Sequence, residues 1–500
     1  MNKNEALEAL KDYEIKSFAL SHATGLLYFD SVTFAPKGSK EVLPETMAEL
    51  SKIKYDLTTA PETVEMLETL NAAKDELDPV KKKEVSELYR NYSRTKMVPK
   101  DEFAEYQKLI STSEAVWNEA KNTNNYEIFE PYLQQVFDMT KKMALYYDNE
   151  KDPYDTMLDM YERGLTQERC DKFFSSLKEG LVPLIKKVSN APKKINNSLL
   201  LKPYSIDKQK EFSEFLIDRL DIDRNYFMVT ETEHPFTTNF SKKDVRITTH
   251  YYENDILNNA YSIMHEGGHA LYELHTGDNL MFTCLAGGVS MGIHESQSRF
   301  YENIIGKSKE FTAIMLNELK NLFPEDFADV TDKNFYEMVN CSAPSLIRLF
   351  ADELTYCMHI IIRYELEKMM VHGEITAKEL PSEWNRLYKE YLGVDVPNYS
   401  QGILQDDHWA GGGIGYFPSY AIGSAYGAQY LMEMNKDFDV KKAIAEDKIC
   451  KINQWFEEKI WKYGSVIDPM DLFKKVCGEF NPKYYIDYLT DKFSEIYDLH

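Results

Sequence analysis

The chain has 500 residues, of which 43% are hydrophobic and 28% charged, an ordinary balance for a folded protein with a large core. Its formal net charge is −24, from 58 basic and 82 acidic residues, so the basic surface that nucleic acids and anionic membranes select is missing. We therefore expect neither nucleic acid nor a membrane as a partner.

The sequence contains no run of about 18 apolar residues, and its first residues enter an amphipathic helical pattern without an apolar signal segment. The six cysteines are far apart and lack the paired spacing of a metal site, which indicates reduced, mostly buried thiols. They are Cys170, Cys284, Cys341, Cys357, Cys450 and Cys477. These features together predict a cytoplasmic protein.

Helical periodicity dominates the first part of the chain, where apolar residues recur at three- and four-residue spacing. The predicted helical stretches are 39–60, 62–96, 101–122, 124–148, 166–190 and 207–220. The alternating, β-branched segment 243–251 then predicts a strand, with partner strands expected at 226–230 and 236–240.

Helices return after this small sheet. One is expected around Met264, another from about His294, and more in the last third, which the glycine-rich stretch Gly411 to Gly415 interrupts. Internal repeats and an interdomain linker are both missing from the sequence. The simplest architecture is one mainly α-helical catalytic unit with a small sheet next to the helix around Met264.

The segment His265-Glu266-Gly267-Gly268-His269 carries the clearest chemical signal. Two histidines four residues apart lie about 40° apart around a helix, so both imidazoles can reach one metal ion. A zinc ion bound in this way lowers the pKa of a bound water to about 7, and the adjacent carboxylate of Glu266 can accept its proton. Six of the 11 histidines fall between His234 and His294, which favours a site over scattered surface residues.

Two glycines inside a helix cost about 1 kcal/mol each relative to alanine. Gly267 and Gly268 therefore predict close approach of another backbone, or of a substrate, to this face of the helix.

A catalytic zinc also needs a third protein ligand and an open position for water. His275 is an unfavourable candidate, because Tyr272 replaces the glycine that would end the helix before it. Glu273 is either a second-sphere group or a solvated carboxylate. A ligand from a separate helix fits tetrahedral geometry best, and Glu295 and Glu302 are the leading pair, between which spacing alone does not choose.

The sequence resembles the carboxypeptidase Taq family of zinc metallocarboxypeptidases in six segments that occur in the family's order. They are His234-Pro235-Phe236, Asp244-Val245-Arg246-Ile247-Thr248, His265 to His269, His294-Glu295-Ser296-Gln297, Ile347-Arg348-Leu349-Phe350-Ala351-Asp352 and Gly402-Ile403-Leu404-Gln405-Asp406-Asp407-His408-Trp409. The segment 29–38 also resembles the family's N-terminal part, with Phe29 in place of a tryptophan, a departure that touches packing and not the site.

This resemblance implies His265, His269 and Glu295 as zinc ligands, Glu266 as general base, and cobalt as a possible substitute for zinc. It implies one catalytic domain over 1–500, with a helical N-terminal part, about 1–200, covering a deep central groove and a catalytic core at about 225–430. The implied activity is broad-specificity removal of single amino acids from the C-termini of flexible peptides by a homodimer.

Three further residues are candidates for stabilising the tetrahedral oxyanion. His408 precedes the glycine-rich stretch, and Tyr416 and Tyr420 follow it; related helical zinc peptidases place a histidine and tyrosines opposite the metal helix.

An exopeptidase must also bind the free carboxylate of its substrate, for which a buried arginine is the best partner. Arg348, in a segment that we expect to be an apolar helix, and Arg246 are the candidates, and the sequence does not choose between them. Arg348 alternatively pairs with Asp352, and Arg246 alternatively braces its strand. His234 is a candidate for lining substrate subsites.

Two competing functions follow from the same residues. One is an oligopeptidase or dipeptidyl carboxypeptidase of the related helical type, and the other is a metal-binding protein with a silent site. The intact Glu266 disfavours the silent site, since a site that only binds metal has no use for this carboxylate. The preferred C-terminal residue, the physiological peptides, the metal used in the cell and the dimer interface do not follow from the sequence.

Overall fold

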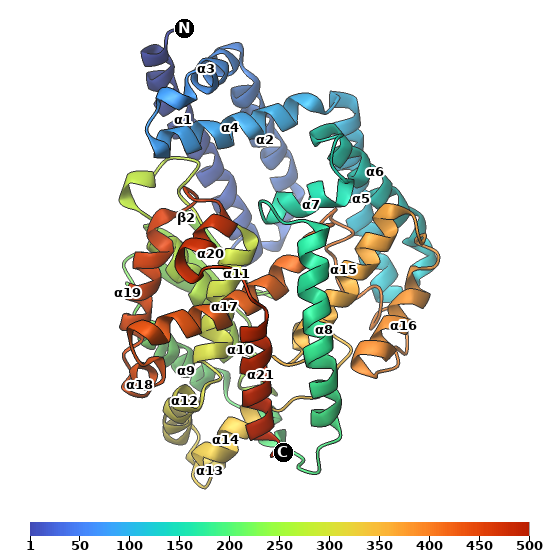
Figure 1. Cartoon of the computed structure of the whole chain (residues 1–500), viewed down its shortest axis with the longest axis vertical. Helices are drawn as coiled ribbons and strands as arrows, with labels where there is room; N and C mark the ends of the chain where they lie inside the picture. The colour runs from blue at the N-terminus through green and yellow to red at the C-terminus, as the bar shows by residue number, and fades with distance from the viewer. Residues whose placement is uncertain (500) are drawn as a thin grey trace. The chain divides into compact units, whose positions relative to one another are not determined.

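The computed structural model describes residues 1–499 and is mainly helical, with one three-stranded sheet within those residues (Figure 1). The chain divides into two units. The first unit comprises 1–96, 200–289 and 440–468, and the second comprises 97–199, 290–439 and 469–500. None of the helices within the described stretch combines the length and apolar character that crossing a membrane requires.

The first unit begins with four helices: α1 (Lys3–Thr33), α2 (Leu43–Thr59), α3 (Pro61–Ala72) and α4 (Pro79–Met97). Asn2 and Glu5 form a capping box that satisfies backbone donors at the start of α1. Leu10 of α1 and Leu67 and Leu70 of α3 are fully buried in one apolar cluster. Burial of these leucines, each stabilising by about 1.5–3 kcal/mol, holds α1 and α3 together.

The sheet of the first unit has the strand order β1-β3-β2. It consists of β1 (Phe227–Glu231), β2 (Thr237–Ser241) and β3 (Asp244–Thr249), with β3 parallel to β1 and antiparallel to β2. All three predicted strands are confirmed to within a few residues. Phe29 of α1 is buried, and its ring lies 6.2 Å from that of Phe240, which agrees with a packing role for this position.

Helix α10 (Asn258–Leu274) packs on β2, β3 and α9 (Ile206–Arg219), so the predicted sheet lies next to the helix with the two histidines, as expected. Asp255 begins α10 by accepting hydrogen bonds from the backbone amides of Leu257 and Asn258. The first unit also contains α18 (Val440–Ala445) and α19 (Ile449–Lys459).

The second unit contains helices and no strands among its described residues. Its N-terminal helices are α5 (Lys100–Thr123), α6 (Glu130–Tyr147), α7 (Pro153–Tyr161) and α8 (Gln167–Ser189). Its middle part contains α11 (Met291–Arg299), α12 (Lys309–Leu322), α13 (Pro324–Phe327), α14 (Asp332–Val339), α15 (Tyr356–His372) and α16 (Leu380–Leu392). Its last helices are α17 (Pro418–Asp437), α20 (Pro469–Cys477) and α21 (Lys483–Ile496).

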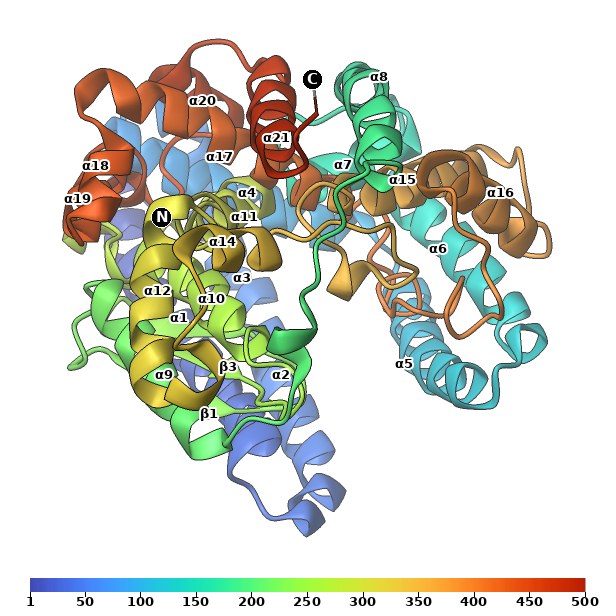
Figure 2. The same cartoon turned by 90° about the horizontal axis from the view of Figure 1, so that it is seen from below.

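Two helix pairs of the second unit are easily followed. Helices α8 and α21 run side by side in Figure 1, and α5 and α6 pack against each other in Figure 2. The central helix α17 is buried along most of its length and packs closely on α11. A π-helical turn, Phe300–Ile305, follows α11 without a break.

Most predicted helical stretches are confirmed, with two differences. The stretch 62–96 is two helices, α3 and α4, because the chain breaks at Asp78-Pro79, where the Asp78 side chain accepts hydrogen bonds from the first amides of α4. The expected apolar helix around Arg348 is wrong: residues 348–350 form a single 3₁₀ turn, and α15 begins only at Tyr356.

Candidate metal centre

The two histidines of α10 lie on one side of the helix. The His265 and His269 ring centroids are 5.0 Å apart, with the ring planes at 81° to each other. On another side, a Cβ atom added to Gly267 would lie 2.3 Å from Cδ1 of Leu220, at the end of α9. The expected close approach at this glycine is therefore confirmed, but the approaching group is a packed side chain rather than a backbone or a substrate.

A metal-binding group is formed by His265, His269 and Glu295. Their ligand atoms all lie within 4.8 Å of one another. Within residues 1–499, this is the one group of three or more histidine, cysteine, aspartate or glutamate side chains placed so that it could hold a metal ion. Two imidazoles and a carboxylate are the donor set of catalytic zinc sites, in which a fourth position is left for water. The side chains present therefore fit a divalent transition metal.

The carboxylate of Glu266 is held by the sheet. Thr237 of β2 donates a hydrogen bond of 2.6 Å to Oε2 of Glu266 and lies 3.0 Å from its carbonyl oxygen. Glu266 itself is buried, with 8% of its surface exposed. This contact fixes the orientation of the side chain next to the two imidazoles.

The two other polar candidates on α10 have structural partners. Glu273 is buried and accepts hydrogen bonds from Asn239 (2.6 Å) and the Gly288 amide (3.0 Å), so its interpretation as a solvated carboxylate is wrong. His275 ends the helix, with Nδ1 2.7 Å from the Leu271 carbonyl oxygen and its ring 5.2 Å from that of Trp461.

Helix α11 presents Glu295 and is capped by two side chains. Ser290 accepts a hydrogen bond from the Ile293 amide, and Oε2 of Glu162 accepts one of 2.8 Å from the Gly292 amide. Burial raises the pKa of Glu162 to about 7. A carboxylate at this end of the helix also interacts favourably with the helix dipole.

Glu295 is surrounded by protein groups. Its Oε1 accepts a hydrogen bond of 2.7 Å from Nε of Arg299, and its Oε2 accepts one of 3.1 Å from Ser298. Gly423 of α17 lies directly against it: an added Cβ would be 2.7 Å from Cβ of Glu295. Only glycine at 423 allows the two helices this separation.

Arg348 is buried, as expected of a carboxylate-binding arginine, but its partner is not Asp352. Its Nε and Nη2 lie 3.0 and 2.8 Å from Oδ1 of Asp406. Arg363 donates from Nε to Oδ2 of the same aspartate at 2.6 Å. The two guanidinium groups hold the pKa of Asp406 well below its usual range.

Asp352 instead organises the turn before α15. It accepts hydrogen bonds from the amides of Leu354 and Thr355 and from the hydroxyls of Ser342 and Thr355. This side-chain-directed turn is the physical reason why the predicted helix does not form here.

His408, Tyr416 and Tyr420 lie together in the second unit. Nε2 of His408 is 3.2 Å from the Tyr420 hydroxyl, and its ring centroid is 5.4 Å from that of Tyr416. The other nitrogen, Nδ1, is 3.2 Å from the Asp407 carboxylate, and burial raises the pKa of both tyrosines. The three candidates for oxyanion stabilisation are thus brought into one cluster.

The glycine-rich stretch after His408 is anchored by Glu367 of α15. This buried carboxylate accepts hydrogen bonds from Trp409 Nε1 (2.7 Å), the Tyr154 hydroxyl (2.8 Å) and the Gly415 amide (2.9 Å). Burial raises the pKa of Glu367 to about 7.

The last two candidates lie on or near the sheet. Arg246 is held by Asp244 through Nε and Nη2, both at 2.8 Å, which matches its interpretation as a brace for the strand. His234 is exposed, and its carbonyl oxygen accepts a hydrogen bond from Thr232.

Sequence reasoning missed Thr237, Glu162 and Arg299. Thr237 directly follows the His234-Pro235-Phe236 segment, and Arg299 stands four residues after Glu295, so both carried a signal in their spacing. Glu162 carried none, because 130 residues separate it from its partner Gly292.

Comparison with known proteins gives a consistent result over the whole chain. The family model described as carboxypeptidase Taq (M32) metallopeptidase matches residues 9–493. Carboxypeptidase 1 of Bacillus subtilis is 40% identical over 479 residues, covering 95% of this chain and 96% of that protein. Thermostable carboxypeptidase 1 of Pyrococcus furiosus is 36% identical, covering 98% and 99% of the two chains.

The fold is similar to solved structures as well. The M32 carboxypeptidase from Deinococcus radiodurans superposes with a TM-score of 0.95 at 31% identity, covering 99% of this chain and all of that one. A Pyrococcus furiosus carboxypeptidase structure gives a TM-score of 0.93 at 36% identity, covering 98% of this chain and 99% of that one.

Proposed function

Because the chain belongs to the carboxypeptidase Taq (M32) family, and is therefore a metallocarboxypeptidase that releases C-terminal amino acids with broad specificity, we propose that it works as a zinc enzyme with Glu266 as general base. The observation that carries this proposal is the convergence of His265, His269 and Glu295 into one ligand group, with Glu266 beside the two histidines in the sequence. Cobalt is expected to replace zinc in the same donor set.

Zinc bound by these three side chains would lower the pKa of a water molecule and polarise the peptide carbonyl. Glu266 then accepts the proton of the attacking water and passes it to the leaving amine. Its hydrogen bond from Thr237 supports this role, because the bond keeps the carboxylate in one orientation before the substrate arrives.

We assign oxyanion stabilisation to His408 and Tyr420, with Tyr416 beside them. The 3.2 Å contact between His408 and Tyr420 orients both donors, and the raised pKa of Tyr420 keeps its hydroxyl proton in place. Such donors act on charge that appears only in the transition state.

For the substrate carboxylate, charge favours Arg348 over Arg246. Arg246 and Asp244 form a balanced pair of opposite charges. Arg348 and Arg363 both contact the carboxylate of Asp406, so Arg348 has only a share of one partner charge in a buried region. A substrate carboxylate would pair with the rest of its charge. His234, exposed beside the sheet, is proposed to line an outer subsite.

Two measurements test the proposed function. Hydrolysis of a blocked dipeptide should disappear on treatment with a chelator and return with one equivalent of zinc per chain. Mass spectrometry of a digested peptide should show a ladder of single-residue losses from the C-terminus, whereas losses of dipeptides or internal cuts would favour the oligopeptidase alternative.

We also propose that residues 1–500 act as one catalytic domain, supported by matches that cover 95% or more of the chain. The scattered cysteines, all free among the described residues, support a cytoplasmic location. The family resemblance supports a homodimer, which light scattering would detect as twice the chain mass of 58.2 kDa.

A further inference from the structure

Arg299, the last residue of α11, contacts Glu295, the proposed third ligand of the metal. Its side chain is 15% exposed, and it donates from Nε to Oε1 of Glu295 at 2.7 Å and from Nη1 to Oε2 of Glu302 at 3.1 Å. The spacings of four and three residues place both carboxylates within reach of one guanidinium. Arg299 therefore links Glu295 to Glu302, the other residue that the sequence offered as a candidate third ligand.

The guanidinium is fixed by two further contacts. Its central carbon lies 4.1 Å from the ring centroid of Tyr356, a cation–π distance. Lys307 lies 3.4 Å from Glu302, so the cluster contains two positive and two negative side chains. Arg299 thus has a balanced charge environment before any metal binds.

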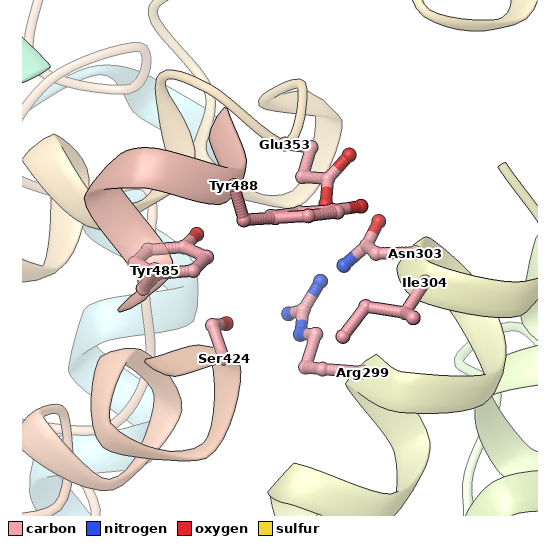
Figure 3. Close-up of a pocket in the computed structure, with 7 residues that line it drawn as sticks. All are labelled: Arg299, Asn303, Ile304, Glu353, Ser424, Tyr485 and Tyr488. Atoms are coloured by element: carbon pink, nitrogen blue, oxygen red, sulfur yellow. The ribbon is translucent and has the colours of Figure 1, made fainter. Parts of the chain in front are cut away.

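Arg299 also lines a small pocket on its other side. Figure 3 shows the guanidinium pointing to the middle of this pocket, with Tyr488 across from it, Asn303 on one side, and Tyr485 and Ser424 on the other. The remaining lining residues are Ile304 and Glu353. Glu353 is balanced by buried Lys492 at 2.7 Å, so the pocket has no unpaired acid of its own among these residues.

We propose that Arg299 is a positioning residue that commits Oε1 of Glu295 to the protein and makes Glu295 a one-oxygen metal ligand. A carboxylate can bind a metal through one or both oxygens. Oε1 of Glu295 accepts a charge-assisted hydrogen bond of 2.7 Å from Arg299. The bond from Ser298 to Oε2, at 3.1 Å, is longer and comes from a hydroxyl that also bonds the Glu295 carbonyl. Of these two side-chain contacts the one to Oε2 is the weaker, and we assign Oε2 to the metal.

The consequence is an open coordination position. If Glu295 used both oxygens, it would occupy the place that the catalytic water needs. Arg299 thus keeps the coordination number low without touching metal or substrate. The proposal rests on Glu295 being a metal ligand, as the proposed function requires.

The test adds Co²⁺ to the full-length protein after its own metal has been removed. Bound Co²⁺ reports on its surroundings, because its visible absorption weakens as its coordination number rises. In R299M we expect at least about tenfold weaker Co²⁺ binding, the usual effect of losing a partner of a ligand, and a weaker absorption band. R299K keeps the charge but has a different geometry. Its Co²⁺ affinity and its absorption band should lie between those of R299M and those of the wild type. In R299A, guanidinium ion at millimolar concentration should restore the band, because it can occupy the space that the removed side chain leaves.

The matched control is K492M, which removes a buried cation on the Glu353 side of the pocket without touching Glu295. It should lower thermal stability and leave the Co²⁺ spectrum unchanged. A folded R299M with wild-type affinity and spectrum would overturn the proposal, and if R299M does not fold, an unchanged spectrum in R299K and no response of R299A to guanidinium would do the same. E295A tests the proposed metal site separately from the proposed role of Arg299. Wild-type Co²⁺ binding in that variant would contradict the metal site itself.

Discussion

Thr237 on β2 donates a hydrogen bond to the carboxylate of Glu266 on α10. Glu266, the proposed general base, stands on a helix, but its side chain is held by a strand, so the sheet takes part in orienting it. The sequence predicted both residues' surroundings, a helix and a strand, yet it could not predict their contact. The alternation of β2 alone does not say which of Thr237 and Thr238 faces α10.

Replacing Glu266 by glutamine should keep the metal and remove most turnover. General acid–base help is worth about 10²–10⁴-fold, so kcat should fall by at least that range. Metal content by atomic absorption, measured on the same samples, should stay at one ion per chain. Turnover near the wild-type rate in metal-loaded E266Q would rule out Glu266 as the base.

Replacing Thr237 by valine should lower kcat about tenfold with little change in KM, because a hydrogen bond to a charged group contributes ~1.5–3 kcal/mol. T237S retains the hydroxyl and should restore most of the rate. T238V, on the neighbouring position of β2, is the matched control and should behave like the wild type. Equal losses in T237V and T238V would point to damage of the strand rather than to the contact with Glu266.

At the scale of elements, long amphipathic helices and the three strands were predictable because their periodicity extends over many residues. The segment around Arg348 was not. An apolar run with Asp352 four residues after the arginine reads as a helix with an internal ion pair, but local bonds of Asp352 form a turn instead. The true partner, Asp406, is 58 residues away and no local pattern points to it.

The packing of α11 on α17 gives a sharp prediction. In G423A the new methyl group meets Cβ and backbone carbon of Glu295 at 2.7 and 2.9 Å, so the helices must separate and the ligand must move. In G427A, one turn further along α17, the nearest atom is the side-chain end of Ile304 at 3.3 Å. Both changes should raise helix propensity by about 1 kcal/mol.

We therefore expect G423A to bind zinc at least about tenfold more weakly than the wild type, and G427A to bind it normally. Competition with a chromogenic chelator measures both affinities under the same conditions. Normal zinc affinity in G423A would show that α11 and α17 adjust without moving Glu295.

At the scale of the whole molecule, buried carboxyls with raised pKa values contribute to the pH dependence of stability, and three of them have large shifts. Burial raises the pKa of Glu162 and Glu367 to about 7, and burial and the neighbouring Glu84 raise that of Glu14 to about 8. A raised folded pKa means that the stabilising contribution is complete below the unfolded value of 4.5 and is lost as pH rises through 7 and 8. Asp406 acts in the opposite direction, but only in strong acid.

The metal-free protein should therefore unfold at its highest temperature near pH 5 and lose stability steadily up to pH 8. The net charge of −24 at pH 7 adds self-repulsion in the same direction. About 0.5 M salt screens the repulsion between exposed charges but not the cost of ionising buried carboxyls, so the slope should persist in salt. E162Q and E367Q should each make the slope shallower, and a melting temperature that rises from pH 5 to pH 8 would contradict this account.

The π-helical turn Phe300–Ile305 follows directly after Arg299 and carries one residue more than an α-helical turn would. A turn of this kind is what the insertion of one residue into an α-helix would produce. A homologue with a single-residue gap at this place would have every following side chain turned by about 100°, and Asn303 and Ile304 would no longer line the pocket behind Arg299. The length of this short segment, rather than the identity of its residues, would then separate relatives that share the pocket from relatives that have lost it.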